Sequence, residues 1–210
     1  MTSRRYELVI LDFDGTLADS FHWFASKLND VARAWGFREV AAGDEARLRQ
    51  MSADEIFRWL QVPRWKVPWI ARDLRRRMAR DIHRIELFDG IATMLEELAS
   101  GEARLAIASS NAADNITTVL GPDLCARIEA FECGVALSGK PARLKRLCRR
   151  FAAPADATLY IGDEVRDIAA ARRAGIVAGA VTWGYNSEDA LRAQGPDLLF
   201  RSVDEIRTRL

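Results

Sequence analysis

Two hydrophobic patterns follow one another along the chain, and they predict different secondary structures. The apolar run at 6–11 has the length and the β-branched residues of a buried strand, and the Asp-Gly-Thr sequence after it indicates a turn that leads into a helix. From residue 21 to residue 84 the apolar positions return at helical spacing instead, with no strand between them. We expect helices there at 21–35, 45–50, 54–60 and 67–84.

After residue 90, short apolar strands alternate with amphipathic helices. The pattern predicts strands at 105–108, 158–161 and 176–181, a short apolar stretch near Val135, and helices at 91–100, 111–120, 142–151 and 165–174. This alternation is typical of a parallel sheet covered on both faces. The sequence therefore predicts an α/β fold, in which residues 1–17 and 86–210 form a Rossmann-like parallel-sheet core and residues 18–85 form an all-helical cap inserted after the first strand.

The predicted cap is rich in two kinds of side chain. It holds five of the six tryptophans, and packing within the cap is the favoured interpretation for most of them: Trp23, Trp35, Trp59, Trp65 and Trp69. Its last part holds eight basic residues: Arg64, Lys66, Arg72, Arg75, Arg76, Arg77, Arg80 and Arg84. A solvated helix face explains such a run, whereas basic residues that face a cleft would favour a small anionic substrate.

Composition fits a globular protein and gives no sign of a charged macromolecular partner. Of the 210 residues, 49% are apolar, and 31 Lys and Arg against 30 Asp and Glu give a net charge of +1. That balance disfavours nucleic acid and membrane surfaces as partners. The three cysteines lack metal-type spacing and fit free thiols in a reducing cytosol. Without a leader-type start or an apolar run of about 18 residues, we expect a cytoplasmic protein, and its oligomeric state stays open.

Polar and charged side chains stand where the predicted strands end. Eight of them follow a strand or precede a helix at these points: Asp12, Asp14, Ser109, Ser110, Asn111, Lys140, Asp163 and Asp167. In a parallel α/β sheet, ligands bind at the carboxyl ends of the strands. Any one of these residues alone is more often a turn former, a helix cap or a surface charge. Together at one sheet edge, they predict a phosphoryl site.

The residue types in this set suit phosphoryl chemistry. Asp12 and Asp14 are so close in the chain that ionising both is costly, and a metal ion relieves that cost. Asp163 completes an oxygen-rich set that suits Mg²⁺. The ion and the Lys140 ammonium would neutralise phosphoryl oxygens, and a Ser109 hydroxyl would hydrogen-bond them. Asp12 would then attack phosphorus, while Asp14 protonates the leaving oxygen and later deprotonates water.

Four segments, in this order, resemble the four motifs of the haloacid dehalogenase superfamily: DFDGTLADS, ASSN, SGKPA and GDEVRD. The ELFDG sequence before a Leu-rich helix resembles the phosphoglycolate-phosphatase-like branch of that superfamily. The resemblance implies Mg²⁺ as cofactor, Asp12 as the nucleophile that forms an aspartyl-phosphate, and Asp14 as acid and base.

The resemblance also implies which residues surround the phosphoryl group and the metal. Those expected around the phosphoryl group are Ser109, Ser110, Asn111 and Lys140, with Ser109 favoured over Ser110 for the hydroxyl role. Those expected around the metal are Asp12, the backbone carbonyl of Asp14, Asp163 and Asp167. Whether Asp167 is an outer-sphere carboxylate or a second metal ligand stays open.

The resemblance also limits which reactions of the superfamily this chain can be expected to catalyse. Dehalogenases of the superfamily lack the second aspartate, and hexose-phosphate mutases carry a hinge histidine ten residues after it, where this chain has Phe24. Imine-forming members need a cap lysine, and nothing around Lys27 or Lys66 indicates a desolvated amine. We therefore predict Mg²⁺-dependent hydrolysis of a small phosphorylated metabolite, a phosphoglycolate-like monoester, beneath a mobile cap. The alternatives are a sugar-phosphate mutase or pyrophosphatase of the same superfamily, or a non-catalytic phosphate-binding regulatory protein.

Overall fold

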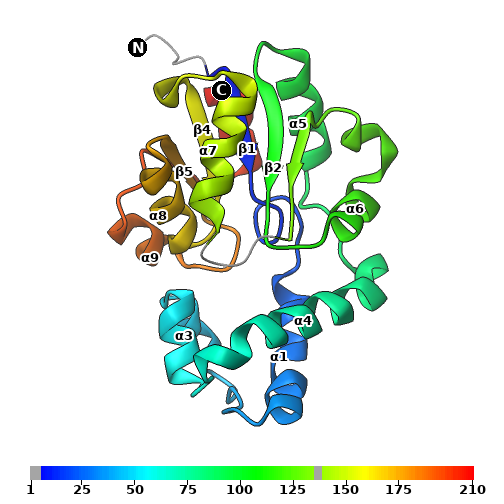
Figure 1. Cartoon of the computed structure of the whole chain (residues 1–210), viewed down its shortest axis with the longest axis vertical. Coiled ribbons are helices and arrows are strands. Elements are labelled where there is room, and N and C mark those ends of the chain that lie inside the picture. Colours follow the sequence, from blue (N-terminus) through cyan, green and yellow to red (C-terminus); the bar gives the residue numbers. More distant parts are fainter. Residues whose placement is uncertain (1–5, 135–138) are drawn as a thin grey trace.

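In the computed structural model, which describes residues 6–134 and 139–210, six strands form one parallel sheet (Figure 1). The strands are β1 (Leu8–Leu11), β2 (Arg104–Ala108), β3 (Ala130–Glu132), β4 (Thr158–Gly162), β5 (Val177–Val181) and β6 (Leu198–Phe200). Their order across the sheet is β3-β2-β1-β4-β5-β6, so the first strand lies in the middle. The sheet confirms the predicted α/β fold of Rossmann-like type.

Helices cover both faces of this sheet. They are α5 (Ile91–Ser100), α6 (Ala113–Cys125), α7 (Lys140–Phe151), α8 (Val165–Ala174), α9 (Glu188–Ala193) and α10 (Val203–Arg209), with a 3₁₀ turn at Ala155–Ala157. Successive side chains of a strand point to opposite faces. Val9 and Leu11 therefore pack with α5, α6 and α10, whereas Leu8 and Ile10 pack with α7, α8 and α9. Burial on both faces explains why all four residues of β1 are apolar.

An all-helical segment, residues 21–84, lies between β1 and α5, and we call it the helical insertion. It comprises α1 (Phe21–Trp35), α2 (Glu45–Leu48), α3 (Ala53–Trp59), α4 (Val67–Asp81) and two 3₁₀ turns, Arg64–Lys66 and Ile82–Arg84. It has its own apolar cluster, built on Leu28, Val31, Leu60, Val62 and Ile70. The insertion lies beyond the carboxyl ends of the strands (Figure 1). No helix in the described part of the chain is long and apolar enough to cross a membrane.

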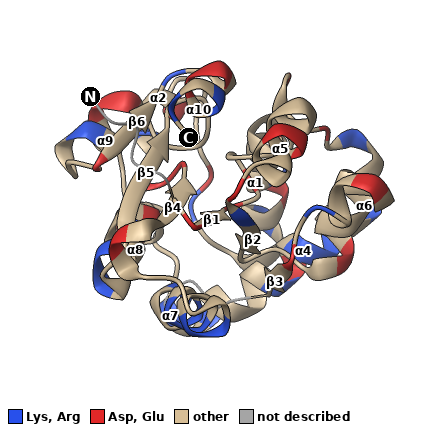
Figure 2. Cartoon of the chain, turned by 90° about the horizontal axis from the view of Figure 1, so that it is seen from above, with Lys and Arg blue, Asp and Glu red and all other residues tan. Residues whose placement is uncertain are grey.

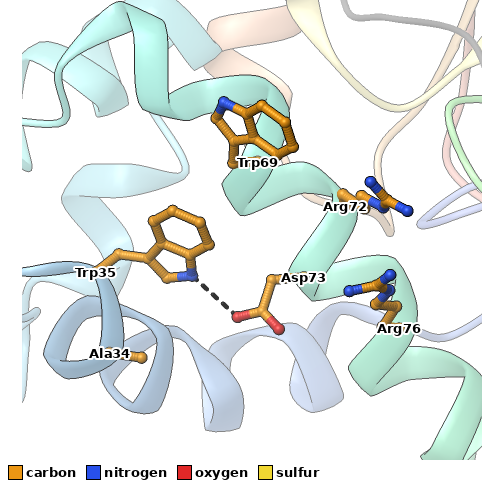
Figure 3. A pocket seen from close by; sticks show the side chains of 6 residues that line it. All are labelled: Ala34, Trp35, Trp69, Arg72, Asp73 and Arg76. Carbon is orange, nitrogen blue, oxygen red and sulfur yellow. Dashed lines mark hydrogen bonds between the residues drawn. The ribbon is translucent and has the colours of Figure 1, made fainter.

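The tryptophans of the insertion divide into packed and exposed ones. Three of the five pack against apolar neighbours, as predicted for most of them, but Trp65 and Trp69 are 69% and 54% exposed. Trp35 Nε1 donates a hydrogen bond to Asp73 Oδ2 at 3.0 Å, which joins α1 to α4 (Figure 3). Beside this bond lies a pocket of about 370 Å³, whose wall includes the exposed Trp69.

Several elements differ from the predicted ones. The helix predicted at 67–84 ends as an α-helix at Asp81, where Asp81 accepts a hydrogen bond from Trp23 Nε1 at 2.9 Å, and continues as a 3₁₀ turn. β3 lies at 130–132, and the apolar stretch near Val135 falls outside the described residues. The hydrophobic pattern does not predict β6, α9 or α10, because elements of 3, 6 and 7 residues are too short to show a clear period.

Candidate active site

The carboxyl ends of three neighbouring strands bring Asp12, Ser109 and Asp163 to one place. β1 pairs in parallel with β2 on one side and with β4 on the other, in matched register, so the residues that follow the three strands lie at the same edge. Asp12, Ser109 and Asp163 are all buried there. Three residues of the predicted set, 97 and 54 positions apart along the chain, therefore share one environment.

Lys140 joins Asp12 to Asp167 inside the protein. Its Nζ lies 2.6 Å from Asp12 Oδ2 and 2.6 Å from Asp167 Oδ1, and all three side chains are at most 4% exposed. Lys140 is the first residue of α7 instead of a residue before the helix, because α7 begins two residues earlier than the predicted 142. Burial acts to lower the pKa of Lys140, but the two carboxylates outweigh it and raise that pKa. The ammonium therefore stays charged.

Both oxygens of Asp167 already accept hydrogen bonds from the protein. Oδ1 accepts from Lys140 and from the Tyr160 hydroxyl at 3.1 Å, and Oδ2 accepts from the Glu164 backbone N–H at 3.1 Å, which caps α8. Burial acts to raise the pKa of Asp167, but Lys140 and Arg166 outweigh it and hold that pKa below its usual value. Asp167 is thus an ionised carboxylate that holds Lys140 in position.

Asp163 is enclosed by donors from two loops. It accepts hydrogen bonds from the Thr16 hydroxyl at 2.8 Å and from the Tyr185 backbone N–H at 2.7 Å. The backbone approaches it closely at Gly184, where an added Cβ would lie 2.3 Å from the Asp163 Cβ. Burial, and then the neighbouring carboxylates, raise the pKa of Asp163 well above its usual value. A negative charge here therefore needs a cation beside it.

The structure supplies the donor set for such a cation. Asp12, Asp163 and Asp167 each offer a carboxylate oxygen, and these oxygens lie within 4.8 Å of one another. Burial also raises the pKa of Asp12, although Lys140 opposes the rise. Three buried carboxylates around one ammonium leave a surplus of negative charge, and hard oxygen atoms are the ligands that Mg²⁺ takes. The residues present therefore fit a divalent cation.

Asp14 lies outside this carboxylate cluster. Its Oδ1 accepts a hydrogen bond from Asn111 Nδ2 at 3.1 Å. The chain bends at Gly15, whose φ of 74° favours glycine, and it passes so close to Asp163 that a Cβ there would lie 2.2 Å from Asp163 Oδ2. Burial, and then the charge of Asp12, raise the pKa of Asp14 to about 7. A carboxyl with that pKa gains and loses a proton readily near neutral pH.

The loop after β2 places the predicted Ser109, Ser110 and Asn111 differently. Ser109 is buried, and its Oγ accepts a hydrogen bond from the Asn111 backbone N–H at 3.1 Å. Asn111 precedes α6 instead of lying within the predicted helix, and its side chain donates to Asp14. Ser110 contributes its carbonyl, which accepts a hydrogen bond from Arg75 Nη1 at 3.3 Å. The loop therefore links the Asp14 carboxyl to the helical insertion.

A family model described as haloacid dehalogenase-like hydrolase matches this chain over residues 9–181. The chain belongs to this family. It is 33% identical over 201 residues to the phosphoglycolate phosphatase of Synechococcus elongatus, an alignment that covers 95% of each protein. It is 24% identical to the phosphoglycolate phosphatase of Vibrio parahaemolyticus, covering 98% of this chain and 96% of that protein. These matches confirm the family and branch that the motifs resemble, and they confirm the prediction of a hydrolase.

Solved structures share the fold of this haloacid dehalogenase-like hydrolase. A haloacid dehalogenase-like family hydrolase from Streptococcus pneumoniae has a TM-score of 0.73 at 22% identity, covering 99% of both chains. CbbY from Rhodobacter sphaeroides, solved in complex with phosphate, has a TM-score of 0.72 at 22% identity, covering 96% of both chains. At this level of identity the likeness concerns the fold.

Sequence reasoning missed two charged residues of this hydrolase, Glu164 and Arg166, which lie between Asp163 and Asp167 in the chain. Arg166 Nη2 donates a hydrogen bond to Glu164 Oε1. Arg166 Nε and Nη1 are buried, and among the described residues they have no hydrogen-bond partner. The signal for them was present in the GDEVRD segment, where two further charges lie between the aspartates.

Hydrogen bonds join the helical insertion of the hydrolase to the loops of the site at two places. On α4, Arg75 reaches the Ser110 carbonyl, as described above. After α2, Arg49 Nη2 donates to the Gly184 carbonyl at 2.7 Å, and Asn186 Nδ2 donates to the Arg49 carbonyl at 2.9 Å. These contacts hold the insertion against the loop after β2 and against the loop at 184–186 beside Asp163.

Most of the eight basic residues at 64–84 face solvent, two bond within the insertion, and one reaches the loop after β2. Figure 2 shows Lys and Arg along α4 and α7. Five of the eight are exposed, which fits the interpretation of a solvated face: Arg64, Arg72, Arg76, Arg80 and Arg84. Among the remaining three, Arg77 pairs with Asp73, Lys66 donates to the Trp35 carbonyl, and Arg75 reaches the loop after β2.

Proposed function

We propose that this hydrolase is a Mg²⁺-dependent phosphatase that cleaves a small phosphate monoester of the phosphoglycolate type through an aspartyl-phosphate on Asp12. One observation carries the proposal: the buried Asp12 is paired with the Lys140 ammonium and lies next to Asp163. Asp14, which follows Asp12 by two residues in the chain, has a pKa of about 7 that suits proton exchange. The 33% identity to a phosphoglycolate phosphatase over 95% of both proteins supports the substrate class.

In the first half of the reaction, Asp12 attacks phosphorus. A bond forms between an Asp12 oxygen and phosphorus, and the bond from phosphorus to the ester oxygen breaks. The leaving oxygen takes the proton of Asp14, whose pKa of about 7 keeps a large share of it protonated near neutral pH. The products of this half are the alcohol, the aspartyl-phosphate and an ionised Asp14.

In the second half, the ionised Asp14 removes a proton from water. The resulting nucleophile attacks the phosphorus of the aspartyl-phosphate, which releases inorganic phosphate and restores the Asp12 carboxylate. Asp14 regains its proton in this step, so one carboxyl serves as acid and then as base. The hydrogen bond from Asn111 Nδ2 at 3.1 Å orients Asp14 for both transfers.

The phosphoryl oxygens need positive charge and hydrogen-bond donors. Mg²⁺, when bound, supplies charge that offsets the negative phosphoryl group and its nucleophile. Asp12, Asp163 and the Asp14 carbonyl would hold it. Lys140 uses two of its three N–H donors on Asp12 and Asp167, and with no other acceptor among the described residues, the third would donate to a phosphoryl oxygen. The Ser109 hydroxyl, next to the same strand end, would donate to a second phosphoryl oxygen.

Asp167 fits an outer-sphere role better than direct ligation. Its two oxygens accept three hydrogen bonds, from Lys140, Tyr160 and the Glu164 N–H. We therefore assign Asp167 to the positioning of Lys140, and Asp163 to the metal.

The surroundings of Phe24 favour hydrolysis over a sugar-phosphate mutase reaction. Its ring packs against Tyr185, with centroids 5.5 Å apart, and Tyr185 also packs against Phe21 at 5.3 Å. This aromatic cluster stands where a mutase would carry its hinge histidine. A small phosphorylated metabolite, in a cytoplasmic setting, remains the predicted partner.

Phosphate release tests the proposal. We expect the wild-type protein with Mg²⁺ to release phosphate from a panel that includes phosphoglycolate, hexose phosphates, nucleotides and pyrophosphate, with phosphoglycolate among the best substrates. Asp12→Asn serves as the blank. Release no greater than the blank on every compound would overturn the proposal in favour of a phosphate-binding regulatory protein. Hydrolysis of pyrophosphate alone would favour a pyrophosphatase.

A further inference from the structure

The middle of the helical insertion meets the core at two short segments. Residues 49–51, between α2 and α3, form what we call the docking segment, and residues 184–187, between β5 and α9, form the joint loop. The apolar cluster of the insertion includes no core residue among those described. A cavity of about 590 Å³ is lined by residues of α3 on the insertion and by residues of α7 and α8 on the core. Hydrogen bonds are therefore the contacts that join this part of the insertion to the core.

Asn186 joins the two parts with its side chain alone. Both N–H groups of its amide are used on the docking segment, because Nδ2 donates to the carbonyls of Arg49 and Met51, at 2.9 Å each. Its Oδ1 accepts a hydrogen bond from the backbone N–H of Val165, the first residue of α8, at 2.9 Å. The residue is 4% exposed, so water does not compete for these bonds. One buried amide thus ties the insertion to the helix that follows Asp163.

Two further hydrogen bonds strengthen this contact. Arg49 Nη2 donates to the Gly184 carbonyl at 2.7 Å, and the Ser187 backbone N–H donates to the Arg49 carbonyl at 2.9 Å. The Arg49 guanidinium also lies over the Phe21 ring, with its Cζ 4.6 Å from the ring centroid. This stacking restricts the side chain to the rotamer that reaches the joint loop. Four hydrogen bonds therefore connect the docking segment to the joint loop.

The joint loop also holds Asp163, the metal ligand of the proposed function. The Tyr185 backbone N–H donates to Asp163 Oδ2 at 2.7 Å, and the Asn186 backbone N–H donates to the Asp163 carbonyl at 3.3 Å. A Cβ at Gly184 would lie 2.3 Å from the Asp163 Cβ, so only glycine lets the loop come this close. The same four residues therefore contact both the docking segment and the carboxylate.

Two events that need the same ordered loop favour one another. Ordering the joint loop costs conformational entropy, and the first event to require it bears that cost. Docking of the insertion is one such event, and binding of a cation at Asp163 is the other. The second event meets a loop that is already in place and is therefore more favourable. By thermodynamic linkage, each event strengthens the other by the same factor.

We propose that Asn186 is a positioning residue that couples docking of the helical insertion to the placement of Asp163 for a divalent cation. With the insertion docked, the joint loop holds Asp163 ready for the cation, and with the cation bound the insertion docks more firmly. The inference rests on the proposed function, in which Asp163 holds Mg²⁺. It implies that the enzyme closes over its substrate chiefly when the metal is in place.

Two variants break the joint from opposite sides. Asn186→Asp keeps an oxygen to accept from the Val165 N–H, but it has no N–H for the two carbonyls of the docking segment. Arg49→Met removes the bond to the Gly184 carbonyl. Each change makes the surroundings of Asp163 one charge more negative, which on its own would tighten the binding of Mg²⁺. Weaker binding of Mg²⁺ therefore reports the lost joint and not the changed charge.

Asn29→Asp is the matched control. Asn29 Nδ2 donates to the Val40 carbonyl at 2.9 Å, and its Oδ1 accepts from the Val40 N–H at 2.8 Å. The substitution therefore makes the same chemical change in a similar bonding arrangement, but inside the insertion and away from the joint loop. Thermal unfolding of each variant shows whether it is folded.

Hydrogen exchange of the backbone amides at 45–59, which span α2 and α3, measures docking. This stretch holds no residue of the carboxylate cluster, so an effect of Mg²⁺ on it must pass through the joint. In wild type and in Asn29→Asp we expect Mg²⁺ to slow this exchange about fivefold or more. In Asn186→Asp and Arg49→Met the exchange should be faster than in wild type, and Mg²⁺ should change it less than about twofold.

Calorimetric titration with Mg²⁺ measures the reciprocal effect. We expect both joint variants to bind Mg²⁺ about fivefold or more weakly than wild type, and Asn29→Asp to bind it as wild type does. Unchanged or tighter binding of Mg²⁺ in Asn186→Asp would overturn the inference. So would a Mg²⁺-dependent protection of 45–59 in that variant as large as in wild type.

Neither measurement needs a substrate, so this inference and the phosphatase proposal can fail separately. If Mg²⁺ protects 45–59 in wild type but no ester yields more phosphate than the Asp12→Asn blank, the phosphatase proposal fails and the joint stands. If wild type releases phosphate and binds Mg²⁺ without any protection of 45–59, the joint fails and the phosphatase proposal stands.

Discussion

Lys140 Nζ lies 2.6 Å from Asp12 Oδ2, and both side chains are 4% exposed. Removing two charges from water is costly, so such a pair is stable only when further bonds satisfy both partners. Asp167 is the second partner of Lys140, and the Phe13 backbone N–H donates to Asp12 Oδ1 at 2.8 Å. The arrangement keeps Asp12, the nucleophile that we propose, ionised next to a cation, which would serve chemistry more than stability.

Replacing Lys140 by Met should reduce both stability and activity. Asp12 and Asp167 would stay buried without their cation, which is expected to cost about 3–5 kcal/mol in the free energy of unfolding. Loss of the phosphoryl contact should lower kcat/KM about a hundredfold or more. Urea unfolding and phosphate release measure the two effects. Lys145→Met, at an exposed position of the same helix, is the control and should leave both near wild type. Wild-type stability of Lys140→Met would contradict the ion-pair argument.

Asp12→Asn and Asp14→Asn should fail at different steps. Without the Asp12 carboxylate no aspartyl-phosphate forms, and turnover should fall by about 10⁴-fold or more. Asp14→Asn keeps the nucleophile but loses the acid and base, so turnover should fall about 10²–10⁴-fold. Mass spectrometry of acid-quenched protein should find a phosphoryl adduct on Asp12 in the Asp14 variant. Mild and equal losses in the two variants would contradict this division of roles.

The positions of the site residues were predictable from sequence because the geometry of parallel strands is simple. Adjacent strands in register end at one edge, so Asp12, Ser109 and Asp163 had to meet once β1, β2 and β4 were recognised as neighbours. The motif spacing also indicated Lys140, although α7 begins earlier than its apolar pattern shows. A polar first turn carries no hydrophobic period that would mark the start of the helix.

Side-chain partners were not predictable in the same way. The sequence contains Glu164 and Arg166, but only the structure shows that two guanidinium nitrogens are buried without an acceptor among the residues described. The exposure of Trp69 likewise depends on which face α4 turns to the insertion's core, and Trp65 is exposed in the 3₁₀ turn before that helix. Local patterns indicate which elements form, whereas burial and pairing depend on contacts between segments far apart in the chain.

The pH dependence of the reaction should follow Asp14. Phosphoryl transfer to Asp12 needs Asp14 protonated, and its pKa is about 7. We therefore expect kcat/KM to be highest below that value and to fall as pH rises through it. The kcat/KM of Asp14→Asn should be low at every pH and should not show this fall. Steady-state rates across the neutral pH range measure kcat/KM for both proteins. The same fall in the variant would assign the pH dependence to a group other than Asp14.

Asp14 also makes stability depend on pH. Its pKa in the folded protein is about 7, raised from an ordinary 3.8, so between these values the folded state binds the proton that the unfolded state has lost. The contribution of Asp14 to the free energy of unfolding therefore decreases as pH rises through that window. Urea unfolding at several pH values without Mg²⁺ should show a shallower decrease for Asp14→Asn. A steeper decrease in the variant would contradict the raised pKa.

Mg²⁺ should stabilise the folded protein through Asp163. The buried carboxylates repel one another without a cation, so Mg²⁺ bound to the folded state raises the free energy of unfolding, by about 2.7 kcal/mol at a hundred times its Kd. At this chain length each 1 kcal/mol corresponds to about 2–4 °C in Tm. Scanning calorimetry with and without Mg²⁺ measures the rise, and a chelator should abolish both the rise and the activity.

Asp163→Asn is the matched variant for this measurement. In the wild type the Thr16 hydroxyl and the Tyr185 N–H donate to different oxygens of Asp163, at 2.8 and 2.7 Å. In the variant the amide oxygen can accept from the Tyr185 N–H while the amide nitrogen donates to the Thr16 hydroxyl oxygen, and one buried negative charge is removed. Without Mg²⁺ the variant should therefore unfold at a temperature equal to or above that of wild type, because the raised pKa of Asp163 reflects unfavourable burial of its charge. With Mg²⁺ its Tm should stay nearly constant while that of wild type rises. A Mg²⁺-dependent rise as large as that of wild type would show that the ion binds elsewhere.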